Sequence, residues 1–289
     1  MGEAISLERI LAQEPRILVD LSAQSMFSDV EWFHLIRRAY DYADIPLSEL
    51  EKARKMLSGF SELFSHEHVY TTENVVREME RGYEMVVNSN AVLKRRKDNS
   101  SGSRQVNHVS RGVPAIQQGM DSLIQTLRRA KSKARASIVG GIDLMGYAVI
   151  ETMVTAVSEE AYSKKDYSYR VGGHIGSRTA DLHADEELVA TAMYLSTLAF
   201  EQVSILTADS DIGRIVDHVV RAVIEAEVPG SFTFIGKLKA NPVRVYFVQS
   251  PGFATLSYDT RDIDPIAIPP LREQVAPEAL AKSMRIYAA

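Results

Sequence analysis

Five acidic residues fall where folding could gather their carboxylates into one site. They are Asp20, Glu78, Asp185, Asp209 and Asp211. Asp20 ends one apolar run and Asp209 follows another, as expected for acids at the carboxyl ends of buried strands. Carboxylates brought this close would repel one another, which would raise the pKa of some of them unless a cation were bound. Because Mg²⁺ and Mn²⁺ prefer oxygen ligands and take further ligands from phosphates, the set predicts a phosphate-ester substrate.

A local explanation competes with the metal site for most of these acids. Asp209 could be the N-cap of the helix that follows, and Asp211 a first-turn acid in the field of the helix dipole, each contributing about 1 kcal/mol. Asp185 could likewise be a cap, and Glu78 could belong to a charged, solvated helix face. Capping does not explain Asp20, which ends a buried strand, so we favour the metal site for the whole set.

The segments around these acids alternate between strand-like and helix-like patterns. The strand-like runs are 16–22, 68–70 and 203–208. Amphipathic helical stripes follow them, and capping boxes at 28–31 and 48–51 mark two helix starts, the second helix ending near Leu63. This alternation predicts a mainly parallel α/β sheet, in which the loops at the carboxyl ends of the strands share one edge.

The centre of the chain is expected to interrupt that sheet with helices. Two long helices, about 114–135 and 136–162, should form an antiparallel hairpin. The polar stretch 98–112 before them is interpreted as a mobile loop, and 166–183 after them as a Gly-rich connection. Beyond Pro229, two strand-like runs, VRVYFVQ and FATLSYD, precede a Pro-rich tail.

The composition fits a globular protein and limits its chemistry. The chain has 289 residues, of which 45% are hydrophobic, and no cysteine, which excludes disulfides, thiolate zinc sites and cysteine nucleophiles. The acidic N-terminal sequence lacks the pattern of an export signal, so we expect a cytoplasmic protein. The apolar segment 136–157 carries Asp143 and Glu151, which argue against a membrane span and for a buried amphipathic helix.

The net charge of −5 hides a strongly basic segment. Residues 91–135 contain eleven Lys or Arg and only Asp98 and Asp121, a local charge of +9 against −14 in the rest of the chain. These cations could neutralise nucleic-acid phosphates and bring a polyanion to an acidic site, or they could form the charged outer face of a helix pair. The candidate nucleic-acid-binding residues are Lys94, Arg95, Arg96, Lys97, Arg128, Arg129, Lys131, Lys133 and Arg135.

Four motifs together resemble a known family. ILVDLS, TTENVVREMERG, ADEELVATAMYLS and ILTADSDIGRI occur in the order and setting found in PIN-domain nucleases, which are metal-dependent ribonucleases. The resemblance covers roughly residues 14–89 and 181–228, and it implies a three-layer, Rossmann-like α/β/α fold with a mainly parallel sheet. The sequence departs from the family in Leu21, in the acidic pair Glu186 and Glu187, and in its long insertion and tail.

By this likeness, Asp20, Asp185, Asp209 and Asp211 would hold Mg²⁺ or Mn²⁺ and Glu78 would assist them. Ser22 and Thr207 would be supporting hydroxyls. A metal-activated water would attack the phosphodiester while the cations stabilise negative charge.

The expected organisation is a discontinuous core with two additions. Residues 1–89 and 181–228 would form the PIN-like core, 90–180 a basic helical insertion, and 229–289 an extension whose strands pack on the core. We therefore expect a nuclease acting on RNA rather than DNA. A non-catalytic scaffold that binds RNA or protein and a structure-specific DNA nuclease are the alternatives. An inhibitory or assembly protein partner and a homo-oligomer are left open, and no membrane partner is expected.

Overall fold

The computed structural model shows an α/β fold around a six-stranded mixed sheet, most of whose strands run parallel. It describes residues 3–28, 47–100, 113–162, 169–171, 174–176, 183–226, 230–263 and 287. The strand order is β1-β8-β7-β6-β2-β3, in which only β8 runs against its neighbours. The strands are β1 (Ala4–Ser6), β2 (Ile17–Val19), β3 (Val69–Tyr70), β6 (Val203–Thr207), β7 (Val243–Ser250) and β8 (Phe253–Asp259).

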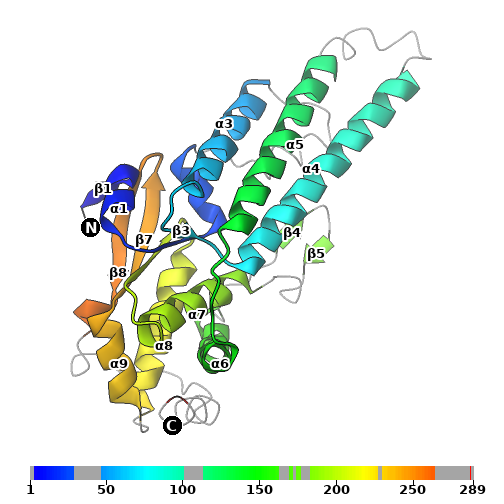
Figure 1. Ribbon diagram of the computed structural model, residues 1–289. Coiled ribbons are helices and arrows are strands. Elements are labelled where there is room, and N and C mark those ends of the chain that lie inside the picture. Colours follow the sequence, from blue (N-terminus) through cyan, green and yellow to red (C-terminus); the bar gives the residue numbers. More distant parts are fainter. Residues whose placement is uncertain are drawn as a thin grey trace.

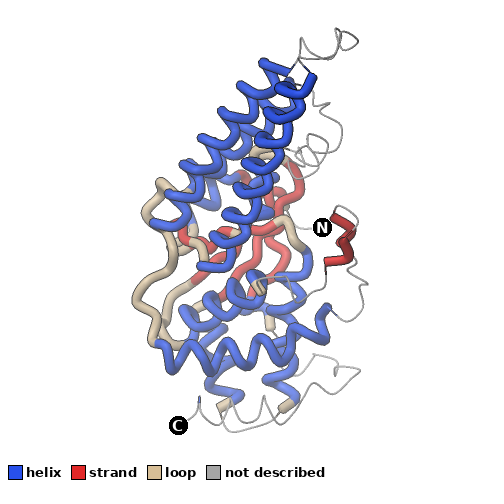
Figure 2. The backbone as a smooth tube through the Cα atoms, turned by 90° about the vertical axis from the view of Figure 1, so that its right-hand side faces the viewer, coloured by secondary structure: helices blue, strands red, loops and turns tan. Residues whose placement is uncertain are grey.

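Helices lie on both sides of this sheet (Figure 2). They are α1 (Leu7–Gln13), η1 (Leu21–Met26), α3 (Leu47–Leu63), α4 (Glu73–Ser100), α5 (Val113–Ala136), α6 (Leu144–Tyr162), α7 (Ala184–Thr197), α8 (Ser210–Glu225), α9 (Ser231–Ala240) and η3 (Thr260–Asp262). Two short strands, β4 (Tyr169–Val171) and β5 (His174–Gly176), pair with each other. No helix in the described ranges is long and apolar enough to cross a membrane.

The sequence correctly placed the central strands. Ile17, Leu18 and Val19 are fully buried in β2, which lies between β3 and β6 and pairs in parallel with both. The strands predicted near 68–70 and 203–208 are β3 and β6, and the helix predicted to end near Leu63 is α3. Strands β7 and β8 also form as expected, and β7 continues the sheet by pairing in parallel with β6.

Some elements differ from the prediction or lie outside the described residues. The sequence did not predict β1, which pairs antiparallel with β8 ahead of α1, and it did not predict α9. The polar stretch 98–112 begins as the last turn of α4, and its remainder, 101–112, is not described. Most of the stretch 28–46, including the first capping box, and the Pro-rich tail at 264–286 also lie outside the described residues.

The predicted hairpin of two long helices is wrong. Helix α5 packs along α3 and α4, whereas α6 packs on α7 and α8, and the two helices point in different directions (Figure 1). The chain leaves α5 through Gly140 and Gly141, the latter with a φ of 75°, before α6 begins at Leu144. The apolar face of each helix was predicted correctly, but the two faces pack against different helices.

Helices α3, α4 and α5 form an arm that extends away from the sheet (Figure 1). The arm has a small apolar core of its own, which includes Met56, Leu57 and Leu123. Helix α6 instead contributes Met153 and Val154 to the large core around the sheet. The segment 90–180 is therefore divided between the arm and the main core.

Candidate active site at the carboxyl edge of the sheet

Asp20 and Thr207 meet because β2 and β6 are parallel neighbours that end at the same edge of the sheet. Thr207 Oγ1 donates to Asp20 Oδ2 over 2.9 Å, and the hydroxyl and backbone N–H of Ser22 donate to the same oxygen. The amide of Ala208 in turn donates to Ser22 Oγ over 2.8 Å. Both hydroxyls expected to support the site thus hold the Asp20 carboxylate in one orientation.

Asp209 continues this network and caps α8. Its backbone N–H donates to Thr207 Oγ1 over 2.8 Å, and its Oδ1 accepts a 2.8 Å hydrogen bond from the amide of Asp211. Asp211 is buried in the first turn of the helix and accepts a 3.3 Å bond from Arg214 Nη1. The capping explanation is therefore correct for Asp209, and the first-turn position is correct for Asp211. The expectation that capping does not explain Asp20 is wrong, because Asp20 is the N-cap of η1 and its Oδ2 accepts from the Ser22 amide. Asp209 is linked to the Asp20 carboxylate through the Thr207 hydroxyl, and Asp211 is linked in turn to Asp209.

Glu78 and Asp185 lie on two helices that meet beside this edge. Thr71, just before α4, donates from Oγ1 to the backbone oxygen of Val19 at the end of β2. Helix α4 also packs on α7. Hydrogen bonds join Asp20, Asp209 and Asp211 through Thr207, while Glu78 and Asp185 stand on the two helices that meet here. The N-cap of α7 is His183 and not Asp185, so the capping explanation for Asp185 is wrong.

The acids at this edge do not form a complete protein cage for a divalent cation among the described residues. Within the described ranges, no three Asp, Glu or His side chains are grouped so that they could surround one metal ion. Asp20 is only 5% exposed, has no ion pair with the described residues, and directs all of its hydrogen bonds with them to Oδ2, which leaves Oδ1 for another partner. Since Mg²⁺ usually keeps several waters and uses one or two carboxylates, this arrangement fits a hydrated cation better than an all-protein cage.

Glu187, an acid of α7, has a partner that the sequence did not predict. Its Oε2 accepts a 2.7 Å hydrogen bond from the amide of Asn74 in the first turn of α4. Burial, together with the charges of Glu151 and Glu73, raises the pKa of Glu187 although the Asn74 amide acts in the opposite direction. Glu187 therefore ties the start of α4 to α7, which is how the helices of Glu78 and Asp185 are held together.

Arg214 is a site residue that sequence reasoning missed. Its side chain is 49% exposed, while the Asp211 side chain that it contacts is 4% exposed. The sequence did contain a sign of this pair, because Asp211 and Arg214 are three residues apart on one helix, where opposite charges interact. Arg214 supplies a partly exposed positive charge beside the acids.

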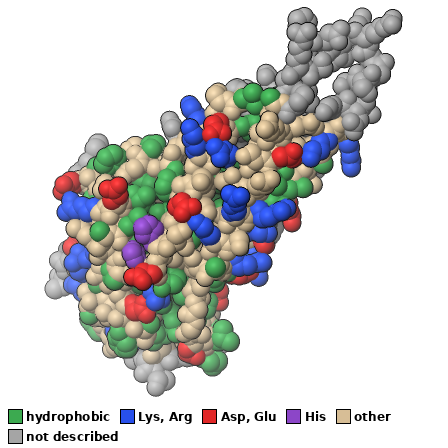
Figure 3. All heavy atoms as spheres, turned by 45° about the horizontal axis from the view of Figure 1, so that its top comes forward, with side chains coloured by type: hydrophobic (Ala, Val, Ile, Leu, Met, Phe, Trp, Pro, Cys, Tyr) green, Lys and Arg blue, Asp and Glu red, His purple; other side chains and the backbone are tan. Residues whose placement is uncertain are grey.

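Most described cations of the basic segment are already paired with neighbouring side chains. Lys131 and Arg135 contact Glu80, Lys133 contacts Glu62, Lys94 contacts Asp121, and Arg128 donates to the hydroxyl of Tyr83. Blue and red side chains are accordingly mixed along the arm (Figure 3). Arg95 and Arg129 are exposed, and the side chains of Arg96 and Lys97 lie outside the described part of the chain. The pairing weakens the case for the arm as a nucleic-acid surface and supports the alternative of a charged outer face.

Comparison with known proteins adds no assignment, because the chain matches no family model, no curated protein and no solved structure.

Proposed function

We propose that this protein is a metal-dependent phosphodiesterase of the PIN type, with a three-layer α/β/α arrangement, that hydrolyses RNA with Mg²⁺ or Mn²⁺. The observation that carries the proposal is the Asp20 carboxylate, buried at the carboxyl edge of the sheet with one oxygen fixed by two hydroxyls and the other unpaired within the described residues. A buried charge that lacks a compensating partner is costly, so such a group is commonly functional.

The hydroxyls of Ser22 and Thr207 would have a positioning role. Because both donate to Oδ2, they fix the plane of the Asp20 carboxylate and direct Oδ1 toward its partner. The same Thr207 hydroxyl accepts from the Asp209 amide and so fixes the second acid relative to the first. A divalent cation bound here would lower the pKa of water and offset charge on the phosphate.

The other acids would complete the negative site around Asp20. Asp211 accepts a hydrogen bond from Arg214, which partly neutralises its charge. We therefore assign it a supporting role beside Asp20 and Asp209. Asp185 and Glu78 complete the negative surface on α7 and α4. Arg214 would contact a non-bridging phosphate oxygen, since an arginine can donate two parallel hydrogen bonds to such a group.

The test is cleavage by an Asp20→Asn variant. We expect Mn²⁺-dependent cleavage of single-stranded RNA to fall about 100-fold or more, because several kcal/mol of charge stabilisation would be lost. The melting temperature should stay nearly unchanged, since the asparagine oxygen can still accept from Ser22 and Thr207. Calorimetric titration with Mn²⁺ should show weaker binding by the variant.

Asp121→Asn is the matched control, because Asp121 lies on the arm and its described contacts are with Lys94 and Asn90. It should cleave at the wild-type rate. If wild-type protein with Mn²⁺ cuts neither RNA nor DNA but binds RNA in a salt-dependent way, the protein is a scaffold and the enzymatic proposal is wrong. Cleavage of branched DNA alone would identify the DNA-directed alternative.

A further inference from the structure

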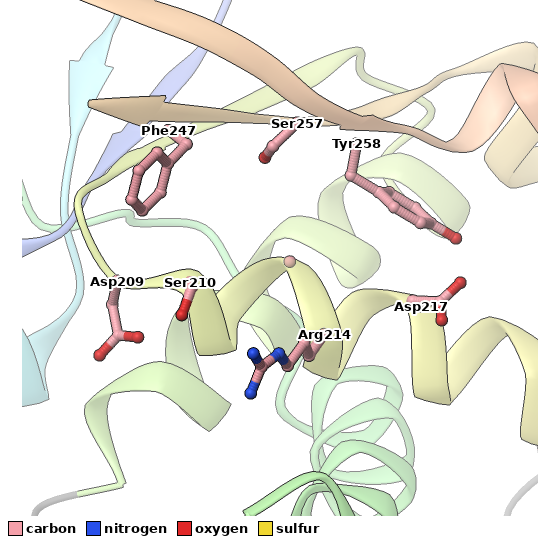
Figure 4. Close-up of a pocket in the computed structure, with 8 residues that line it drawn as sticks. Asp209, Ser210, Arg214, Asp217, Phe247, Ser257 and Tyr258 are labelled. Carbon is pink, nitrogen blue, oxygen red and sulfur yellow. The ribbon is translucent and has the colours of Figure 1, made fainter. Parts of the chain in front are cut away.

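A hollow of about 300 Å³ lies between α8 and the β7–β8 hairpin, beside Asp209. Phe247, Ser257 and Tyr258 line it from the strands, and Ser210 and Asp217 line it from the helix (Figure 4). Its volume is at the lower end of the range of roughly 300–1,000 Å³ that is typical of small-molecule sites. The hollow therefore suits one small ring system.

Tyr258, one of the two rings of the aromatic wall, lies beside Asp217 (Figure 4). Tyr258 is half-buried, and burial together with the negative charge of Asp217 raises the pKa of its hydroxyl. That hydroxyl stays protonated at neutral pH and is paired with Asp217, which also accepts a 2.7 Å hydrogen bond from Arg221 Nε. A ring fixed in advance costs little conformational entropy when a ligand stacks on it.

The helical wall is open because residue 213 is a glycine. A Cβ built on Gly213 would find only Ser257 Oγ within 4 Å, at 3.9 Å, so there is free space where other residues would place a side chain. Ser257 Oγ donates its proton to the backbone oxygen of Val245 over 2.9 Å. Its lone pairs are then free to accept a hydrogen bond from a ligand in the hollow.

The hollow shares Asp209 with the proposed active site. Asp209 lies at one end of it near Phe247, and Tyr258 and Asp217 lie toward the other end (Figure 4). Arg214 also lines it and is partly exposed. A ligand with a phosphate near Asp209 and Arg214 would thus extend a neighbouring group between the two walls.

We propose that this hollow is a nucleobase subsite, which binds the base of the nucleotide next to the phosphate that is cut. The inference rests on the proposed function. Aromatic side chains bind unpaired bases by stacking, and serine hydroxyls can meet the polar edge of the base. The requirement for an unstacked base means that the substrate is single-stranded at this position.

The experiment fills the hollow without disturbing the helix. Gly213→Met would place a side chain in the space, and Gly213→Ala is the matched control because it adds only a methyl group. Each protein is titrated in EDTA with the four nucleoside 5′-monophosphates, and binding is followed from the amide NMR signals of residues 213 and 257. We expect Gly213→Met to weaken binding about tenfold or more, and Gly213→Ala to bind like the wild type.

A second variant and a second probe keep the result interpretable. Phe247→Ala removes a ring without filling the space and should weaken binding of the same nucleotides, which covers the case in which Gly213→Met fails to fold. Ribose 5-phosphate, which has no base, should compete poorly. Equal binding by Gly213→Met and Gly213→Ala, or equal competition by ribose 5-phosphate, would overturn the subsite.

The outcome is independent of catalysis because no metal is present in the titration. Binding of nucleotides in the hollow by a protein that cuts nothing would support a nucleobase site there and contradict the proposed nuclease. Conversely, an active nuclease whose nucleotide binding ignores residue 213 would contradict the subsite alone.

Discussion

Glu14 is a buried carboxylate at the opposite edge of the sheet from Asp20, beside the amino ends of β6 and β7. Its oxygens accept hydrogen bonds from Ser204 Oγ over 2.6 Å, from the Tyr246 hydroxyl over 2.6 Å and from Arg244 Nη1 over 2.8 Å. Arg244 is itself paired with Asp259. Each member of this group is therefore satisfied by another, as a buried charge requires.

Replacing Glu14 by glutamine should destabilise the fold by about 3 kcal/mol, because Arg244 would lose one of its two buried counter-charges. Urea denaturation at pH 7 measures this loss. Glu8→Gln is a suitable control, since Glu8 is exposed in the first turn of α1 and its replacement should change stability little. An equal effect of the two substitutions would mean that the Glu14 network contributes no more than a surface charge.

The same residue predicts a pH dependence. Burial alone raises the pKa of Glu14, but the hydrogen bonds from Ser204 and Tyr246 and the charge of Arg244 outweigh it, so the pKa lies below its ordinary value of 4.5. Its stabilising contribution is thus complete above about pH 4.5 and is lost as the pH falls through the lower pKa of the folded state. Stability measured in this acid range should fall more steeply for the wild type than for Glu14→Gln.

Helix α3 passes the end of η1 at Gly59, and the close packing there predicts how the protein responds to a larger residue at this position. A Cβ on Gly59 would lie 2.4 Å from Cδ1 of the Phe27 ring, whereas a Cβ on Gly236 in α9 would meet nothing within 4 Å. Gly59→Ala should therefore cost about 1–3 kcal/mol through overpacking, despite the better helix propensity of alanine. Gly236→Ala should stabilise the protein by up to about 1 kcal/mol. Thermal denaturation of the two variants should give shifts of opposite sign.

The success of the sequence in predicting elements depended on how local each signal was. The strand at Ile17, Leu18 and Val19 was recognisable because a strand buried on both faces is apolar at every position. The start of α8 was recognisable because capping involves only Asp209 and the next two residues. Periodicity also marked the apolar faces of α5 and α6, but it carries no information on which partner each face meets, so the hairpin prediction failed.

At the scale of the whole molecule, the two apolar clusters predict two levels of stability. Val154 of α6 and Val216 of α8 are fully buried in the main core, whereas Leu123 of α5 belongs to the smaller core of the arm. In native-state hydrogen exchange at low denaturant, the amides of residues 154 and 216 should exchange together through global unfolding. The amide of residue 123 should exchange earlier, through opening of the arm. Early exchange of residue 154 together with residue 123 would instead support an independent 90–180 domain.

The site was only partly accessible from the sequence for a related reason. The sequence predicted Asp20 and Asp209 at one edge because parallel strands end together, which is a rule of topology. It could not establish the depth of contact between α4, α7 and the sheet, which determines how near Glu78 and Asp185 come to Asp20. The pairing of Lys131, Lys133 and Arg135 with acids of α3 and α4 was likewise hidden, because these partners are far apart in the sequence.

Strand β2 has three residues and runs from the edge of the sheet that holds Glu14 to the edge that holds Asp20. The Glu14 carboxylate is fully paired, whereas Oδ1 of Asp20 has no partner among the described residues. One short strand thus connects an edge that stabilises the fold to an edge that leaves an acid available for chemistry. A descendant of this protein could lose or exchange the acids at the carboxyl edge and still fold, because the opposite edge would keep β2, β6 and β7 in register. The fold can therefore persist through changes at the carboxyl edge.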